Sequence, residues 1–135
     1  MLIDRNLKET LSRCRTVAVV GISSNIDRPS FRVAAYLQSQ GYRIIPVRPD
    51  GDSILGEKVY RNLMEIPAEI EIDVVDIFRK SEEVLPVVEE ALRRGVKVIW
   101  MQEGVLNEEA ARKGTEAGKE VFMDCCIKKE HQRLF

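Results

Sequence analysis

Residues 16–47, TVAVVGISSNIDRPSFRVAAYLQSQGYRIIPV, decide the fold, because two apolar runs flank one helical pattern in this segment. The first run, Thr16–Val20, is rich in β-branched residues and ends at Gly21, as a buried strand does before a turn. The second run is Arg43–Val47. A strand, a helix and a second strand in this order form a βαβ unit, whose strands are parallel and whose crossover is right-handed.

The connection between these runs divides into a loop and a helix. Residues 22–29, most of which are polar, predict the loop, and Pro29 or Ser30 can begin the helix. Residues 30–39 carry an apolar stripe at helical spacing, and Gly41 can end the helix.

The same alternation continues on both sides of this unit. Upstream, residues 4–14 predict an amphipathic helix. Downstream, residues 73–78 and 97–101 predict strands, with a helix over 82–94 between them. The remaining expectations are a loop at 50–57, a short buried turn or helix at 59–66, a helix capped by Asn107 and ended by Gly118, a strand at 120–123 and a short C-terminal helix.

This pattern predicts one domain over residues 1–135. Alternating strands and helices form a three-layer α/β/α, Rossmann-like fold, with about five mainly parallel strands in a doubly wound sheet. The composition agrees, since 44% of the residues are hydrophobic but only 6% are aromatic. Buried parallel strands favour such a core of aliphatic side chains.

Charge and cysteine content exclude several classes of protein. Lys and Arg number 21 against 22 Asp and Glu, so no broad basic surface for nucleic acid or anionic lipid is expected. The charged N-terminus lacks a signal-peptide core, and no apolar stretch is long enough to span a membrane. Three cysteines, an odd number, indicate reduced thiols. We therefore expect a cytoplasmic protein without nucleic-acid or membrane partners.

The ligand site is expected at the carboxyl ends of the strands, where open α/β sheets bind ligands. Residues 21–30, GISSNIDRPS, follow the first strand. Their glycine permits close backbone approach, and their hydroxyl groups and the following helix N-terminus can hold a phosphate. This loop is a candidate cradle for a diphosphate, although an ordinary solvated βα turn has the same composition.

A standard NAD site is disfavoured. The loop has one glycine where the dinucleotide fingerprint has three. Arg48 follows the second strand, where NAD-binding proteins place an acidic residue against the ribose. A guanidinium there suits a ribose phosphate, which the 2′-phosphate of NADP and the 3′-phosphate of coenzyme A (CoA) supply equally well. The negative charge of Asp50, two residues after Arg48, slightly weakens the case for either phosphate.

Five segments carry a family resemblance over nearly the whole chain. They are VAVVGISSNIDRPSFRVAAYLQSQGYRIIPVRP (17–49), ILGEKVY (54–60), DVVDIFRKSEEV (73–84), VIWMQEGVLNEEAA (98–111) and MDCCIKKEH (123–131). In order and spacing they resemble the small CoA-binding proteins related to the N-terminal domain of the succinyl-CoA synthetase α subunit. The second, histidine-bearing domain of that subunit has no counterpart here, so ligase activity is not carried over.

The resemblance implies a set of CoA-binding residues at the strand ends. The diphosphate would lie along the first loop, the adenosine and 3′-phosphate beside the second strand, and the pantetheine or ribose between the next two strand ends. The implied residues are Gly21, Ile22, Ser23, Ser24, Arg28, Ser30, Pro46, Val47, Arg48, Pro49, Phe78, Arg79, Met101, Gln102, Glu103 and Gly104. Two positions depart from the family pattern: Arg48 replaces the usual Asn, and Cys125 replaces a residue that is usually basic.

The candidate catalytic residues have simpler structural interpretations. We expect His131, the only histidine, to be solvated or to cap a helix. Cys125 and Cys126 could join Asp124 and His131 at a metal, but the spacing of a zinc site is not met. These thiols could also form a mixed disulfide with CoA, but cysteines of this kind are more commonly buried and unreactive. Trp100 is expected in the core, Cys14 as a small buried apolar residue, and Glu103 beside the ligand.

The leading hypothesis is a protein that binds CoA or acyl-CoA without catalysis, as a sensor, a carrier or a partner subunit. It assigns no catalytic or metal-binding residue and allows a homo-oligomer or a protein partner. One alternative is an NADP-dependent oxidoreductase, which the missing glycines oppose. The other is a thiol-based redox or acyl-handling enzyme that uses Cys125 or Cys126.

Overall fold

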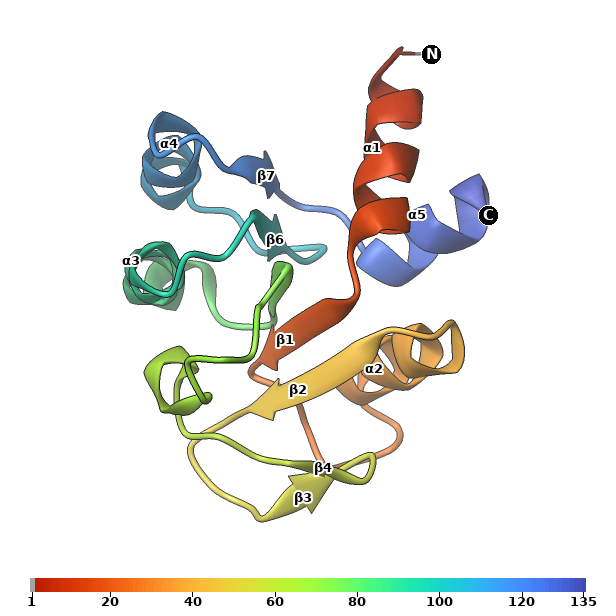
Figure 1. The fold of residues 1–135 in the computed structure, drawn as a ribbon, viewed down its shortest axis with the longest axis vertical. Coiled ribbons are helices and arrows are strands. Elements are labelled where there is room, and N and C mark those ends of the chain that lie inside the picture. Colours follow the sequence, from red (N-terminus) through yellow and green to blue (C-terminus); the bar gives the residue numbers. More distant parts are fainter. Residues whose placement is uncertain (1) are drawn as a thin grey trace.

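The computed structural model describes residues 2–135 and has a five-stranded parallel sheet at its centre. The strand order is β2-β1-β5-β6-β7. This arrangement confirms the predicted doubly wound, Rossmann-like fold (Figure 1). The strands are β1 (Thr16–Val20), β2 (Arg43–Val47), β5 (Val74–Ile77), β6 (Val98–Met101) and β7 (Glu120–Phe122).

Helices cover both faces of the sheet (Figure 1). On one face lie α1 (Leu2–Arg13), α2 (Pro29–Ser39) and α5 (Ile127–Leu134), and on the other lie α3 (Val84–Arg93) and α4 (Glu108–Glu116). Successive residues of β1 pack alternately into the two apolar cores, with Val17 and Val19 in one and Ala18 and Val20 in the other. Because both faces are covered, all five residues of β1 are buried, as the apolar run predicted.

One segment differs from the expected loop at 50–57. It contains a small antiparallel hairpin of β3 (Ser53–Ile54) and β4 (Glu57–Lys58). The two residues at its tip, Leu55 and Gly56, both have positive φ, as a type I′ turn requires. Leucine seldom adopts this conformation, so the residues gave little sign of the turn. The buried side chain of Ile54 and a hydrogen bond from Gln38 to the Leu55 carbonyl attach the hairpin to the domain.

The shorter predicted features are present. The 3₁₀ helix η1 (Leu63–Glu65) provides the buried turn expected before Pro67. The Asn107 side chain accepts a hydrogen bond from the Ala110 N–H and caps α4. A second 3₁₀ helix, η2 (Ser81–Glu83), precedes α3. Trp100 is fully buried, and its indole N–H donates to the Cys125 carbonyl at 2.8 Å.

The topology determines where a ligand can enter. The chain crosses from β1 to β2 on one side and continues to β5 on the other side of β1, so the strand order reverses between β1 and β5. Loops diverge at such a reversal and leave a crevice at the carboxyl edge of the sheet. No helix within residues 2–135 is long and apolar enough to cross a membrane.

Candidate functional site

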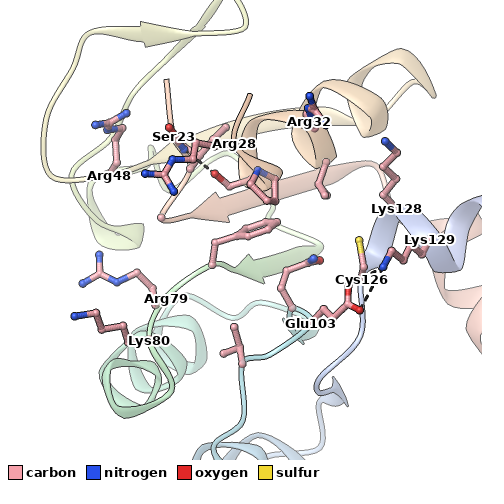
Figure 2. Close-up of a pocket in the computed structure, with 18 of the residues that line it drawn as sticks. Ser23, Arg28, Arg32, Arg48, Arg79, Lys80, Glu103, Cys126, Lys128 and Lys129 are labelled. Atoms are coloured by element: carbon pink, nitrogen blue, oxygen red, sulfur yellow. Dashed lines mark hydrogen bonds and ion pairs between the residues drawn. The ribbon is translucent and has the colours of Figure 1, made fainter. Parts of the chain in front are cut away.

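A cavity of about 1110 Å³ opens at the carboxyl ends of β1, β2, β5 and β6. Side chains from the β1–α2 loop and from α2 form one wall, and residues at the N-terminus of α5 form the wall beside it (Figure 2). The cavity is therefore in the crevice that the topology predicts.

The β1–α2 loop is ordered by its own polar groups. The Gly21 N–H donates to the Val47 carbonyl at 2.9 Å, which fixes the start of the loop against β2. The Ser30 hydroxyl accepts a hydrogen bond from the Ser23 N–H at 2.9 Å, and the Ser23 hydroxyl accepts one from the Asn25 N–H at 3.0 Å. These contacts give the loop its shape before any ligand is bound.

The N-terminus of α2 lacks the groups that normally neutralise a helix end. No side chain caps it, and no acidic residue lies in its first turn. Instead, Arg28 occupies the N-cap position and Arg32 lies in the following turn. Free N–H groups and the helix dipole already make this end positive, and the one carboxylate nearby, Asp27, is 3.9 Å from Arg32 and mostly in solvent, so this end favours a bound anion.

Basic side chains dominate the cavity wall. Seven of them line it, against the two carboxylates of Glu83 and Glu103. The protein as a whole has a formal charge of −1, so this concentration of positive charge is local. The basic residues, all labelled in Figure 2, are Arg28, Arg32, Arg48, Arg79, Lys80, Lys128 and Lys129.

Four of these cations are already paired with carboxylates, and the loosest pair joins Arg32 to Asp27 at 3.9 Å. Arg48 pairs with Asp50 at 2.9 Å, and Arg79 pairs at 3.0 Å with Glu83, four residues further along the chain. Lys129 pairs with Glu103 at 2.9 Å. All four pairs are partly or largely exposed, so water screens them and each contributes little to stability.

Hydrogen bonds from the end of β6 hold the N-terminus of α5 against the cavity. The Gln102 amide oxygen accepts from the Ile127 N–H at 3.0 Å, and Gln102 itself is 3% exposed. The Asp124 carboxylate accepts from the Gly104 N–H at 2.8 Å, with Asp124 at a φ of 59°. These contacts direct four residues of this segment to the cavity, namely Cys126, Lys128, Lys129 and Gln132.

Most residues predicted for the site line one cavity. Those that reach its wall are Gly21, Ile22, Ser23, Arg28, Ser30, Arg48, Pro49, Phe78, Arg79, Gln102 and Glu103. The cavity lining does not include Ser24, Pro46, Val47, Met101 or Gly104. Val47 and Met101 belong to the core on the α3 and α4 face, Pro46 is buried within β2, and Ser24 and Gly104 are exposed.

Several lining residues were absent from the predicted set. They are Pro29, Arg32, Val33, Lys80, Glu83, Val105, Cys126, Lys128, Lys129 and Gln132. Arg32 could have been found, because it lies one helical turn after Arg28. The residues of α5 could not, since no local pattern indicates which strand end a C-terminal helix will cover.

The two adjacent cysteines differ in position. Cys126 lines the cavity, whereas Cys125 does not. Burial raises the pKa of the Cys125 thiol to about 11, which suppresses the reactive thiolate at neutral pH. Among the described residues, no cluster of three His, Cys, Asp or Glu side chains could hold a metal ion.

The expectation for His131 was wrong. Its side chain is 5% exposed and its Nδ1 is 2.7 Å from the Tyr36 hydroxyl. The imidazole therefore neither caps a helix nor extends into solvent. The ring lies on the side of α5 that faces α1 and α2, where other aromatic rings surround it.

Asp76, in the middle of β5, is a buried group that the sequence analysis did not single out. It is fully buried, and neither carboxylate oxygen has a hydrogen-bond partner among the described residues. Desolvation by burial raises its pKa well above the ordinary value. Burial therefore favours the protonated, neutral form of this carboxyl.

Comparisons with known proteins agree on one family. Residues 15–132 match the family described as CoA binding domain. The chain is 45% identical over 125 residues to the uncharacterized protein YneT of Bacillus subtilis, covering 93% of this chain and 91% of that protein. It is also 30% identical over 123 residues to the ADP-forming acetate–CoA ligase II of Archaeoglobus fulgidus, covering 90% of this chain but only 18% of the ligase.

Solved structures show the same fold over almost the whole chain. A hypothetical protein from Pyrococcus horikoshii OT3 superposes with a TM-score of 0.92 and 37% identity, covering 97% of this chain and 91% of that protein. The Thermus thermophilus protein called cell-free ID.343 superposes with a TM-score of 0.93 and 34% identity, covering 98% of each chain.

Proposed function

The chain belongs to the CoA-binding domain family, and we propose on this basis that it binds CoA in the cavity at the carboxyl edge of its sheet. The main support is the basic lining of that cavity. A protein with a net charge of −1 places seven cations around one pocket, which suits a ligand with several phosphate charges.

The residues present fit such a ligand. CoA has a diphosphate, a ribose 3′-phosphate and a long, mostly neutral pantetheine arm. Free N–H groups at the start of α2, together with Ser23 and Arg28, would hold the diphosphate. Phe78, Gln102 and Val105 offer a less charged surface for the pantetheine, leading toward the α5 wall.

Arg48 would bind the ribose 3′-phosphate. Its side chain is 23% exposed, while that of its partner Asp50 is 78% exposed. A phosphate can therefore take the place of a carboxylate that is mostly in solvent, and a guanidinium binds phosphate through two parallel hydrogen bonds. Arg79 and Lys80 lie on the same side of the cavity and add to the positive charge there (Figure 2).

We propose binding without turnover. Both lining carboxylates are engaged, Glu83 by Arg79 and Glu103 by Lys129. The only histidine contributes to the core of the α5 face and not to the cavity wall. General acid–base catalysis needs a free group within reach of the ligand, and these residues do not offer one. The domain would hold CoA or acyl-CoA for a separate partner.

The residues of this cavity also bear on the two alternative functions, an NADP-dependent oxidoreductase and a thiol-based enzyme. The NADP hypothesis has Arg48 in its favour, but the β1–α2 loop lacks the glycines that bring a dinucleotide pyrophosphate close to the backbone. The thiol hypothesis is restricted to Cys126, because only this cysteine of the adjacent pair lines the cavity. Cys126 therefore remains a candidate for exchange with a disulfide of CoA, in which its thiolate would attack the disulfide and release one CoA thiolate.

Isothermal titration of ligand-stripped protein tests the proposal, with CoA, dephospho-CoA, NADP and NAD as ligands. We expect selective binding of CoA, weakened about tenfold or more by Arg48→Ala or by removal of the 3′-phosphate, since either change removes a charge-assisted pair. Arg43→Ala is the matched control, because Arg43 is an exposed arginine at the opposite end of β2. Binding of NADP without binding of CoA would overturn the proposal.

A further inference from the structure

One side of α5 packs through an aromatic cluster centred on His131. The imidazole stacks on the Phe135 ring with centroids 4.4 Å apart, and it meets the rings of Tyr36 and Tyr42 edge-on at 5.4 and 5.7 Å. The Tyr36 hydroxyl lies 2.7 Å from Nδ1. This cluster joins α5 to the C-terminal half of α2 and to the start of β2.

The surroundings of the cluster disfavour a charged imidazole. The Lys128 ammonium lies over the Tyr36 ring at 5.7 Å, and the Lys8 ammonium of α1 lies over the Phe135 ring at 5.4 Å. On α5 itself, Glu130 is already paired with Arg133. Tyr42 donates its hydroxyl hydrogen to the Leu11 carbonyl. The ring itself is buried, and among the described residues no carboxylate is paired with it, so a proton on the imidazole would be a buried charge without a counter-ion.

The same helix forms a wall of the cavity. His131 lies on the side of α5 that packs on α2, while Lys128, Lys129 and Gln132 reach the cavity from the adjacent side. A helix moves as a unit, so a shift of α5 away from Tyr36 also displaces these three residues. The Gln102–Ile127 hydrogen bond ties the first residue of α5 to the end of β6, so a shift away from Tyr36 pivots the helix about this residue and moves Gln132 furthest.

We propose that His131 is a positioning residue that makes ligand binding depend on pH: its neutral ring holds α5 in place, and protonation releases the helix and weakens binding. The identity of the ligand, CoA, rests on the proposed function. The movement of the helix does not depend on it.

The direction of the effect follows from linkage. Burial lowers the pKa of His131 below its ordinary value of 6.5, so the docked helix binds a proton less readily than the released one. Docking is therefore fully favourable above about pH 6.5 and is progressively lost as the pH falls below that value.

Binding at two pH values tests the inference. CoA carries a phosphomonoester, and such groups titrate near pH 6, so dephospho-CoA is the ligand that isolates the protein's contribution. We expect its dissociation constant to rise about threefold or more from pH 7.5 to pH 5.5 in the wild-type protein. His131→Asn can still pair with the Tyr36 hydroxyl but cannot be protonated, so its dissociation constants should match at the two pH values. An equal pH effect in both proteins would overturn the inference.

Hydrogen exchange of the ligand-free protein separates this inference from the proposed function. Protection factors of residues 127–134 should fall from pH 7.5 to pH 5.5 in the wild type, while those of α4 stay constant as an internal reference. If CoA fails to bind but α5 loses protection, the proposed function is wrong and the pH-dependent release stands. If α5 keeps its protection at pH 5.5, the release is wrong whatever CoA does, and this outcome needs no variant to fold.

Discussion

A Cβ atom placed on Gly21 would lie 2.1 Å from the carbonyl oxygen of Phe78. The ends of β1 and β5 are thus in contact through a backbone position that has room only for hydrogen. Gly21 also has a φ of +90°, which other residues rarely adopt. Both requirements arise at the reversal of strand order, where the loops after β1 and β5 start from adjacent strand ends before they diverge.

Gly21→Ala should therefore destabilise the fold by about 2–4 kcal/mol, because the methyl group must displace backbone and not a flexible side chain. Urea unfolding measures the loss. Gly41→Ala is the control, since Gly41 has a similar φ of +95° but nothing within 4 Å of the added Cβ. Equal losses in the two variants would mean that backbone conformation alone, and not the contact with Phe78, requires glycine at position 21.

Arg94 should contribute strongly to stability although it forms no ion pair in the described structure. Its guanidinium donates to the carbonyls of Ile66, Pro67 and Ile70 at 3.1, 2.6 and 3.1 Å, and so joins this loop to α3. We expect Arg94→Leu to cost about 2–4 kcal/mol in urea unfolding, since several partly buried carbonyls lose a charged donor. The exposed neighbour gives the control Arg93→Leu, which should cost about 0.5 kcal/mol or less.

Asp76 should make the stability of the protein depend on pH in the acidic range. Its pKa is raised in the folded state, so the folded protein keeps a proton that the unfolded chain releases near pH 3.8. The contribution of this group is fully favourable below that pH and is lost as the pH rises toward the folded-state pKa.

Asp76→Asn removes this titration and isolates its effect. The free energy of unfolding of the variant, relative to wild type, should increase steadily as the pH rises from 4 to 7. Denaturation at a series of pH values provides the measurement. A constant difference across this range would show that the Asp76 carboxyl is not held protonated by burial.

Cys126 should be shielded by the ligand, because it lines the cavity. We expect saturating CoA to slow the alkylation of Cys126 by iodoacetamide about fivefold or more, as measured by peptide mass mapping. Cys125 serves as an internal control: its pKa of about 11 predicts slow alkylation with or without CoA. If CoA binds but the alkylation rate of Cys126 is unchanged, the pantetheine arm does not extend to the α5 wall.

The local sequence contained most of what defines the β1–α2 side of the site. Apolar runs such as Thr16–Val20 predict buried parallel strands, and the polar residues after them then meet at one edge of the sheet. Gly21, Arg28 and Arg48 could be placed there because each is adjacent in sequence to a strand end or a helix start. Their grouping needed only the order of elements, which short-range patterns specify.

Other features depend on contacts between distant parts of the chain. The hydrogen bond between Tyr36 and His131 joins residues 95 positions apart, and no local pattern predicts that α5 packs on α2. The unpaired state of Asp76 likewise follows from which side chains the neighbouring strands place around it. The sequence by itself thus determined the fold and the edge of the sheet that offers a phosphate site. Only tertiary packing decided how that site is closed, because the position of a helix depends on the distant surfaces it meets as well as on its own residues.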